Sequence, residues 1–325
     1  MINEIIILGT NEIAYLLARN YHELYNKKAT IFGHKVNNVM SYTKIADISI
    51  IPSLLEERTF LKILKEFYLL NQKDKIMLIP TNVEYINLLN KVKDKLDQNY
   101  LMNIPNNELI EILTDQEKFK STYKNKLNIS ENSIISAQDR LYEITAYVGS
   151  DSNTKVISFG EVSIKDGIDN PLVITSSYDE FGYKKEILDK ISSFLEKIEY
   201  KGFAQILLKR NEKMDNYEVI KIIPNLSMTG YLLTACGYNC VKLLEKDIIN
   251  KEPMSKKVIE NQFVINLVPY NFIRKYTKSI LLKQQTFYLI DNGKSINPFK
   301  YNKDKSIGRK FIYYKRNKDY KERIK

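Results

Sequence analysis

The chain has 325 residues, of which 44% are hydrophobic and 27% are charged, and its formal net charge is +11. This composition is typical of a globular protein of about two domains, and it excludes a disordered or collagen-like chain. No apolar run approaches the roughly 18 residues that a membrane-spanning helix needs, and the short run at residues 5–8 does not resemble a signal peptide. We therefore expect a cytoplasmic protein without an integral membrane segment.

The first 125 residues alternate short apolar runs with amphipathic segments. We expect strands at residues 4–8, 29–32, 47–51 and 75–79, and helices at residues 12–25, 56–70 and 84–96. Strands that alternate with helices predict a mostly parallel, Rossmann-like sheet that is covered on both faces.

Two polar loops follow strands of this predicted sheet. Gly9, Thr10 and Asn11 follow the first strand, and Thr81 and Asn82 follow the fourth. Ligands of such sheets bind at the carboxyl ends of the strands, so these five residues are candidate substrate-binding residues. They are equally suited to cap the helices that follow them. The first loop has one glycine where a dinucleotide-binding loop has three, which argues against a nicotinamide or flavin enzyme.

The pattern changes after residue 125. We expect strands at residues 140–148, 155–164, 172–175, 202–209 and 217–223, and helices at residues 184–198 and 229–245. Long strands joined as hairpins predict an antiparallel sheet with flanking helices, an α+β arrangement. We therefore predict an α/β domain at residues 1–125, an α+β domain at residues 126–260 and a basic C-terminal extension at residues 261–325.

Two cysteines and two histidines limit the metal chemistry of the chain. Cys236 and Cys240 lie four residues apart in a predicted helix, far in sequence from His22 and His34. A metal pair is conceivable, but such a spacing with no further ligand beside it is typical of small core residues. We expect two core thiols and no zinc site.

Positive charge is concentrated at the C-terminal end. Residues 301–325 hold ten Lys and Arg and three acidic residues, interleaved with aromatic side chains. This segment is a candidate surface for anionic lipid, nucleic acid or a phosphorylated substrate, or else a solvated terminal helix. No recognised nucleic-acid-binding motif is present, so we do not expect a nucleic-acid partner.

A family resemblance is carried by motifs in a fixed order. Gly-Phe-Ala at residues 202–204, Ile-Ile-Pro-Asn at 222–225 and Thr-Ala-Cys-Gly-Tyr-Asn at 234–239 follow one another. Segments 78–85, 113–119 and 296–301 fit the same order. The chain resembles the ATP-grasp family, specifically the D-aspartate ligase-like branch of its carboxylate–amine ligases. The resemblance implies a Rossmann-like domain that precedes an ATP-grasp domain.

The resemblance also implies a chemistry. In such ligases ATP lies between two α+β subdomains, and Mg²⁺ held by acidic side chains and an asparagine bridges its phosphates. The substrate carboxylate forms an acyl phosphate, which an amine converts to an amide. The reaction would join an amino acid to a cell-wall peptide precursor, and the net charge of +11 suits an anionic substrate of this kind.

The expected magnesium ligands are replaced in this chain. The family's acidic residue on the first hairpin strand corresponds to Leu207. Its motif Glu-Ile-Asn-Pro-Arg on the second strand has Lys221, Ile223 and Asn225 at the acidic, asparagine and arginine positions. Because leucine and isoleucine have no donor atom and lysine repels a cation, we predict no metal ligand and no catalytic residue. Lys209, Lys221 and Asn225 are candidate nucleotide contacts, and we expect ATP and Mg²⁺ binding to be weak or lost.

We also expect much of the family's nucleotide-clamping subdomain to be absent, because few residues separate Phe119 from the strand that begins at Arg140. The glutamate with which the family grips ATP would correspond to Ala137. The predicted function is a binding or regulatory role, with an active paralogue as a candidate partner. The alternative is an active ligase with shifted ligands such as Asp139, Asp215 or Glu218. If the hairpin descends from a metal site, Leu207 should face Lys221 and Ile223 across adjacent antiparallel strands.

Overall fold

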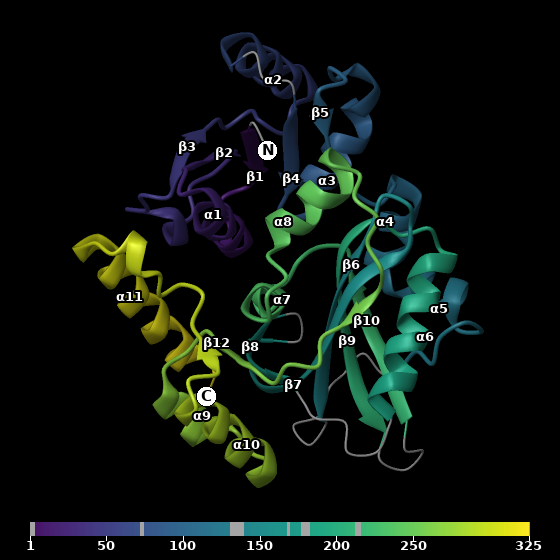
Figure 1. The fold of residues 1–325 in the computed structure, drawn as a ribbon, viewed down its shortest axis with the longest axis vertical. Helices are drawn as coiled ribbons and strands as arrows, with labels where there is room; N and C mark the ends of the chain where they lie inside the picture. The colour runs from purple at the N-terminus through teal and green to yellow at the C-terminus, as the bar shows by residue number, and fades with distance from the viewer. Residues whose placement is uncertain are drawn as a thin grey trace.

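The fold contains two β-sheets, one formed by the N-terminal part of the chain and a larger one formed by the rest (Figure 1). The computed structural model describes residues 4–71, 75–130, 140–167, 170–176, 183–211 and 216–324. Within these ranges, no helix combines the length and the apolar composition needed to cross a bilayer.

The N-terminal sheet is parallel, as the alternation of strands and helices predicts. Its strand order is β3-β2-β1-β4-β5. The strands are β1 (Glu4–Leu8), β2 (Ala29–Gly33), β3 (Ala46–Ile50), β4 (Ile76–Pro80) and β5 (Tyr100–Leu101). The helices are α1 (Glu12–Tyr25), α2 (Glu57–Asn71) and α3 (Val83–Val92), with short turns η1 (Asn38–Met40) and η2 (Lys93–Lys95).

Alternation along β1 explains why both faces of this sheet are covered. Ile5 and Ile7 pack with buried residues of α1 on one face of the sheet. Ile6 and Leu8 pack with Phe60 of α2 and with residues of α3 on the other face. Successive side chains of a strand point to opposite faces, so a strand that is apolar throughout requires a layer on each side.

The larger sheet is mixed and mostly antiparallel. Among the described residues it has eight strands, in the order β10-β9-β6-β7-β8-β12-β13 with β11 paired to β7. They are β6 (Leu141–Val148), β7 (Thr154–Lys165), β8 (Pro171–Ser176), β9 (Gly202–Asn211), β10 (Asn216–Ile223), β11 (Lys257–Val258), β12 (Val264–Asn266) and β13 (Ser295–Ile296). Strands β12 and β13 lie in the segment that the sequence indicated as an extension, and they are members of this sheet.

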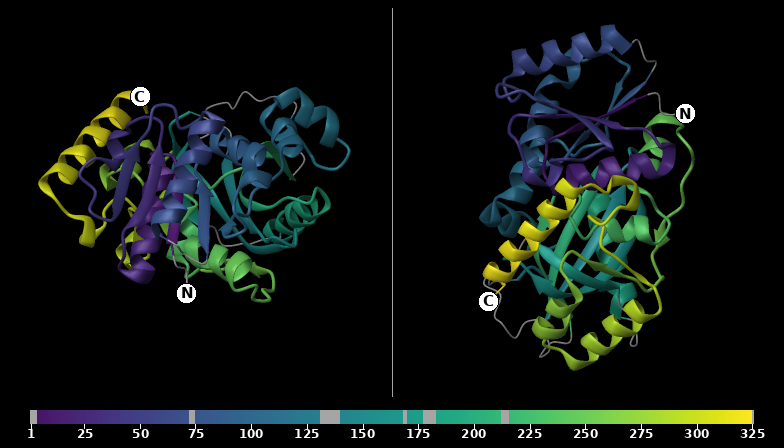
Figure 2. Two further views of the ribbon diagram at one scale, coloured as in Figure 1. Left: turned by 90° about the horizontal axis from the view of Figure 1, so that it is seen from above. Right: turned by 90° about the vertical axis from the view of Figure 1, so that its left-hand side faces the viewer.

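Helices cover both faces of the larger sheet. One face packs against α4 (Asn107–Thr114), α5 (Gln116–Tyr123) and α6 (Tyr183–Lys197). The main core cluster joins the other face to the N-terminal sheet, because Tyr147 of β6 and Tyr231 share it with Ile7 of β1. Helices α9 (Tyr270–Tyr276) and α10 (Ile280–Asp291) lie at the far end of the sheet (Figure 2).

The prediction of a single helix at residues 229–245 is wrong. The structure has α7 (Tyr231–Ala235) and α8 (Cys240–Leu244), followed by the π-helical turn η3 (Glu245–Ile249). Gly237 separates α7 and α8 with φ of +97°, a left-handed conformation that glycine adopts without a steric penalty. Asn239 then caps α8 by accepting hydrogen bonds from the amides of Val241 and Lys242. Both cysteines are buried free thiols, as expected for core residues.

The chain returns to the N-terminal sheet after β13. The turn η4 (Asn302–Asp304) precedes the long helix α11 (Ile307–Arg323), which lies beside α1 and residues 36–44. The carboxylate of Asp304 is fully buried and accepts hydrogen bonds from the hydroxyls of Tyr15 and Thr43, at 2.8 and 3.0 Å, and from the amide of Lys44 at 2.6 Å. Arg309 completes the cluster with an ion pair of 3.3 Å.

We predict that Asp304→Asn destabilises the fold by about 3 kcal/mol, because Arg309 would keep a buried charge without its counter-ion. Urea unfolding followed by circular dichroism measures the change. Asp291→Asn, at an exposed position in α10, is the matched control and should change stability by less than about 0.5 kcal/mol. Equal stabilities of the two variants would contradict this assignment.

Candidate functional site

A cavity of about 340 Å³ lies where the loops after β1 and β4 meet the end of β10. Residues from both sheets line it, among them Asn11, Thr81, Asn82, Gln205, Lys221 and Asn225. Three of the five candidate substrate-binding residues and two of the three candidate nucleotide contacts are therefore brought together. Lys221 is the only charged side chain among the described residues that line this cavity.

The backbone carbonyl of Thr81 joins the loops of this cavity. It accepts a hydrogen bond of 3.0 Å from the side-chain amide of Asn11 and a second from the side-chain amide of Asn225. The hydroxyl of Thr81 donates to the carbonyl of Leu8 at 2.8 Å. The ends of β1, β4 and β10 are thus held at one point.

The polar loop residues also cap helices. Asn11 accepts a hydrogen bond from the amide of Ala14 in α1, and Asn82 accepts one from the amide of Tyr85 in α3, both at 3.1 Å. The capping interpretation from the sequence is confirmed for these two residues. Because the same side chains line the cavity, capping holds them in fixed positions toward a ligand.

Gly9 and Thr10 lie beside the cavity and are not among the residues that line it. Gly9 has φ of +113°, and a Cβ atom there would lie 2.1 Å from the hydroxyl oxygen of Thr81. Thr10 is buried and donates a hydrogen bond of 2.7 Å to the carbonyl of Lys35. These two residues shape the loop and allow the close approach of Thr81.

The predicted register of the β9–β10 hairpin is confirmed. Leu207 pairs with Lys221, and Gln205 pairs with Ile223, across antiparallel strands. Leu207 is 3% exposed and packs with Leu141, and Ile223 packs against the same cluster. Leu207 and Ile223 therefore belong to a small apolar cluster beside Lys221, and these three side chains offer no oxygen ligand for a magnesium ion.

The other candidates near the hairpin lie apart from the cavity or outside the described residues. Lys209 does not line the cavity, and its ammonium lies 3.2 Å from the carboxylate of Glu218. Asp139, Asp215 and Ala137 lie outside the described residues. Across the part of the chain that the structure describes, no group of three or more His, Cys, Asp or Glu side chains could hold a metal ion.

The sequence analysis missed Glu143, a fully buried carboxyl directly behind the cavity. Glu143 pairs with Leu207 in the β6–β9 ladder. It accepts hydrogen bonds from the hydroxyls of Thr145, Ser227 and Thr229, at 2.7–3.0 Å, and from the amide of Gln205 at 3.0 Å. A glutamate in the middle of an otherwise apolar strand was the signal in the sequence, but its partners on residues 227 and 229 were not evident.

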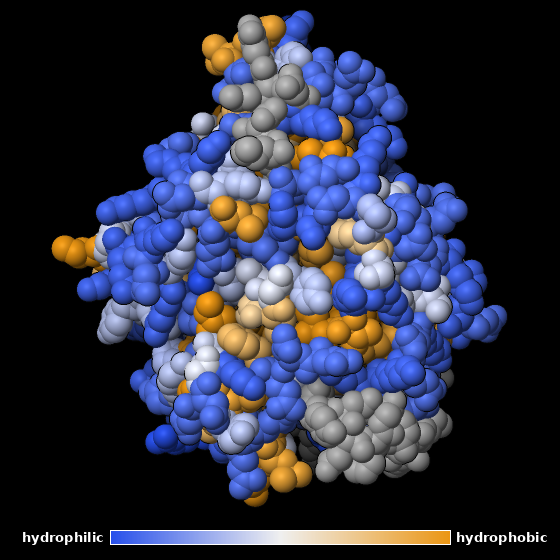
Figure 3. All heavy atoms as spheres, viewed as in Figure 1, coloured by the Kyte–Doolittle hydropathy of each residue, from blue (hydrophilic) through white to orange (hydrophobic). Residues whose placement is uncertain are grey.

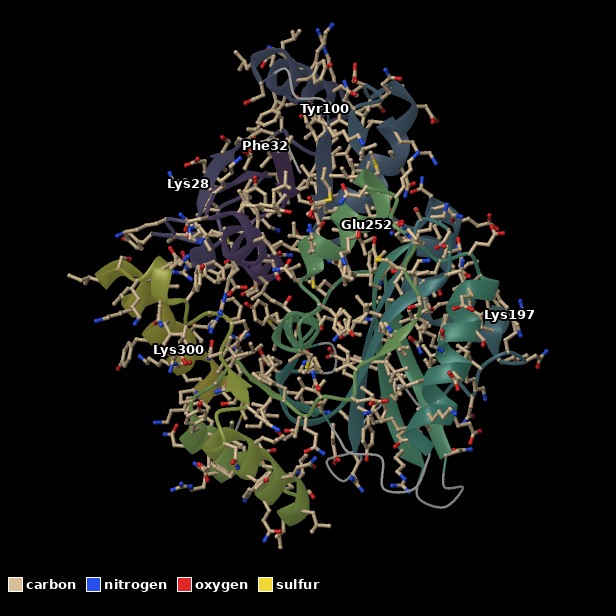
Figure 4. The ribbon with its side chains drawn as sticks, in the orientation of Figure 1. Lys28, Phe32, Tyr100, Lys197, Glu252 and Lys300 are labelled. Atoms are coloured by element: carbon tan, nitrogen blue, oxygen red, sulfur yellow. The ribbon has the colours of Figure 1, made fainter. Side chains whose placement is uncertain are left out.

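Glu143 positions one wall of the cavity. Gln205 and Ser227 line the cavity and donate to Glu143, and Ser227 also accepts a hydrogen bond of 2.7 Å from the amide of Gly230. Burial raises the pKa of Glu143, although the four neutral donors act in the opposite direction. The carboxyl thus fixes the loop that follows β10. Figure 4 draws the side chains that fill the space between the two sheets.

We predict a pH-dependent difference between the native protein and Glu143→Gln. A raised pKa in the folded state stabilises the fold below the usual pKa of the carboxyl, and this contribution is lost as pH rises through the raised value. The native protein should therefore lose stability relative to the variant as pH rises above the usual pKa of a glutamic acid side chain. Urea unfolding at a series of pH values measures this difference.

Glu108→Gln, at an exposed position in α4, is the control for the loss of a carboxylate. Its stability difference from the native protein should stay constant over the same pH range. A constant difference for Glu143→Gln as well would mean that the buried carboxyl is ionised throughout.

The fold is similar to that of biotin carboxylase domains, as comparison with solved structures shows. The chain is similar to the biotin carboxylase domain of a single-chain bacterial carboxylase, with a TM-score of 0.59, 7% identity and coverage of 80% of this chain and 73% of that one. It is also similar to biotin carboxylase from Campylobacter jejuni, solved as a β-γ-ATP complex, with a TM-score of 0.56, 13% identity and coverage of 76% and 71%.

Comparison of the sequence with those of known proteins also finds a relative. The chain is 21% identical to D-aspartate ligase of Enterococcus faecium (strain Aus0004), over 94% of this chain and 91% of that protein. No protein-family model matches the chain. The resemblance to ATP-grasp carboxylate–amine ligases of the D-aspartate ligase-like branch is confirmed.

Proposed function

We propose that this protein binds a small anionic molecule in the cavity between its two sheets and has lost the magnesium-dependent ligase reaction of its relatives. The hairpin carries this proposal. Leu207 and Lys221 face each other at the positions where the family has acidic ligands, and Leu207 is packed against Leu141. A hard cation needs oxygen ligands, and an adjacent ammonium group repels it.

The length of the chain supports the loss of the clamping subdomain. The alignment with D-aspartate ligase spans 395 positions and this chain has 325 residues, so at least 395 − 325 = 70 positions have no residue of this chain. A shortening of this size is what the loss of a small subdomain would produce. Without that subdomain, one side of a bound nucleotide would have no protein contacts.

The lining of the cavity supports an anionic ligand. One ammonium group, that of Lys221, lies among neutral amides and hydroxyls such as Asn11, Asn82 and Ser227. Amide and hydroxyl groups can orient a carboxylate, and the lysine supplies a charge-assisted hydrogen bond. The relative is named for D-aspartate, so a dicarboxylic amino acid is the first ligand to test.

The wider role follows from this loss of chemistry. A protein that holds a ligand without converting it acts as a binding or regulatory protein. We retain three expectations from the sequence as parts of the proposal: an active paralogue as partner, a cell-wall precursor as an alternative anionic ligand, and a cytoplasmic location.

The alternative is an active ATP-dependent carboxylate–amine ligase with atypical ligands. The similarity to D-aspartate ligase over 91% of that protein favours it. In that case ATP would bind with a metal ion held by residues other than those at positions 207, 221 and 223.

Calorimetry with ATP, with and without Mg²⁺, tests the two functions. We expect weak or no binding of ATP and no strengthening by Mg²⁺, because Leu207 and Ile223 offer no ligand atoms. Calorimetric titration of the same sample with D-aspartate should show binding. Micromolar affinity for ATP that depends on Mg²⁺ would support the active ligase and overturn the proposal.

We predict that Lys221→Met weakens D-aspartate binding by about 10- to 100-fold, since a hydrogen bond to a charged group contributes about 1.5–3 kcal/mol. The matched control is Lys209→Met on the neighbouring strand, whose ammonium is paired with Glu218 and does not line the cavity. It should bind D-aspartate like the native protein. Equal weakening by the two variants would indicate a general charge effect and no specific site.

A further inference from the structure

Helix α11 buries an arginine and exposes large apolar side chains, the reverse of the usual distribution on a surface helix. Its buried residues include Arg309 and Tyr320, and the Arg309 guanidinium lies 4.2 Å from the centre of the Tyr15 ring. Its outer face carries large apolar side chains: Ile307 is 87% exposed, Phe311 62% and Tyr314 69%. At 3.6 residues per turn, positions 307, 311 and 314 form one continuous stripe along the helix.

Lysines border this stripe. Lys310, Lys315, Lys318 and Lys321 are all exposed and lie on the same side of the helix, together with one acidic residue, Glu322. The face therefore combines three apolar side chains with a local charge of +3. Part of the basic segment indicated by the sequence is buried, and the rest forms this ordered face.

A second exposed segment adjoins the stripe. Tyr42 is 65% exposed, and its ring lies so close to Gly308 that a Cβ atom there would be 2.4 Å away. Val36, 71% exposed, lies in the same loop. Figure 2 shows α11 on the outside of the molecule, and Figure 3 shows apolar atoms that protrude at its outer end. We call Val36, Tyr42, Ile307, Phe311 and Tyr314, with the four lysines, the α11 face.

The chemistry of this face selects one kind of partner. Exposed aromatic side chains beside lysines match the boundary between the acyl chains and the anionic headgroups of a membrane. A second copy of the chain would bring like charges together, because each copy has a net charge of +11. The phosphate backbone of a nucleic acid would match the lysines, but it would leave the apolar side chains of Ile307 and Phe311 without an apolar contact.

We propose that the α11 face binds the protein reversibly to the surface of an anionic lipid membrane. Phe311, Tyr314 and Ile307 enter the headgroup region, and the lysines contact lipid phosphates. This surface is separate from the cavity at Lys221, so it does not depend on which ligand or reaction the cavity serves.

Vesicle co-sedimentation of the full chain tests the proposal, with vesicles of phosphatidylcholine containing phosphatidylglycerol and vesicles of phosphatidylcholine alone. The native protein should bind the anionic vesicles and be released by salt. Lys318→Gln with Lys321→Gln should weaken binding by about 25-fold, at roughly 1 kcal/mol for each lysine. Phe311→Ser with Tyr314→Ser should weaken it by about tenfold or more.

Ile280→Ser with Leu281→Ser is the matched control, because these two residues of α10 are 72% and 78% exposed and lie outside the α11 face. This variant should bind vesicles like the native protein. Thermal melting of each variant checks that the fold is intact.

Four outcomes would overturn the proposal. The first is equal binding to neutral vesicles, and the second is unchanged binding by the Phe311 and Tyr314 variant. The third is a native dimer, seen by analytical ultracentrifugation, that the same variant dissociates, since the face would then serve a second copy. Binding of RNA that depends on the lysines alone, with no vesicle binding, would likewise assign the face to nucleic acid.

Discussion

One backbone carbonyl, that of Thr81, links the two sheets by hydrogen bonds. It accepts hydrogen bonds from the side-chain amides of Asn11, at the start of α1, and of Asn225, just after β10. Three strand ends from two separately patterned parts of the chain therefore meet at a single oxygen atom. The cavity lies where these ends converge, and Asn11, Thr81 and Asn225 both make the junction and line the cavity.

The hairpin beside this junction depends on features that do not require a metal site. The ladder between β9 and β10 is specified by backbone hydrogen bonds and by the alternation of side chains, neither of which requires acidic residues. Leu207 and Ile223 stabilise it by packing in one apolar cluster. Glu143 retains a carboxyl on the same sheet, but its oxygens are occupied by Thr145, Gln205, Ser227 and Thr229.

Local patterns in the sequence were sufficient for the longer strands, for the parallel arrangement of the N-terminal sheet and for the hairpin register, but they missed the short strands β5, β11, β12 and β13. They failed where one residue changes the direction of the backbone, as Gly237 does between α7 and α8. They also failed where the partner is distant in sequence. Glu143 and Thr229 are 86 residues apart, and nothing in the apolar pattern of β6 indicates a hydroxyl cluster opposite it. The inward arginine of α11 depends on the ring of Tyr15, nearly three hundred residues earlier.

The buried cluster around Asp304 has a consequence for the order in which the protein is assembled during synthesis. Tyr15 and Thr43 are synthesised well before Asp304, because their hydroxyls donate to a carboxylate that follows them by 289 and 261 residues. Strands β12 and β13 also add to the large sheet late. The strands of the N-terminal sheet are all made before residue 102, but the hydroxyl of Tyr15 in α1 has no buried partner until Asp304 follows. The nascent chain therefore exposes that side of α1 until the segment with Asp304 and Arg309 has been made.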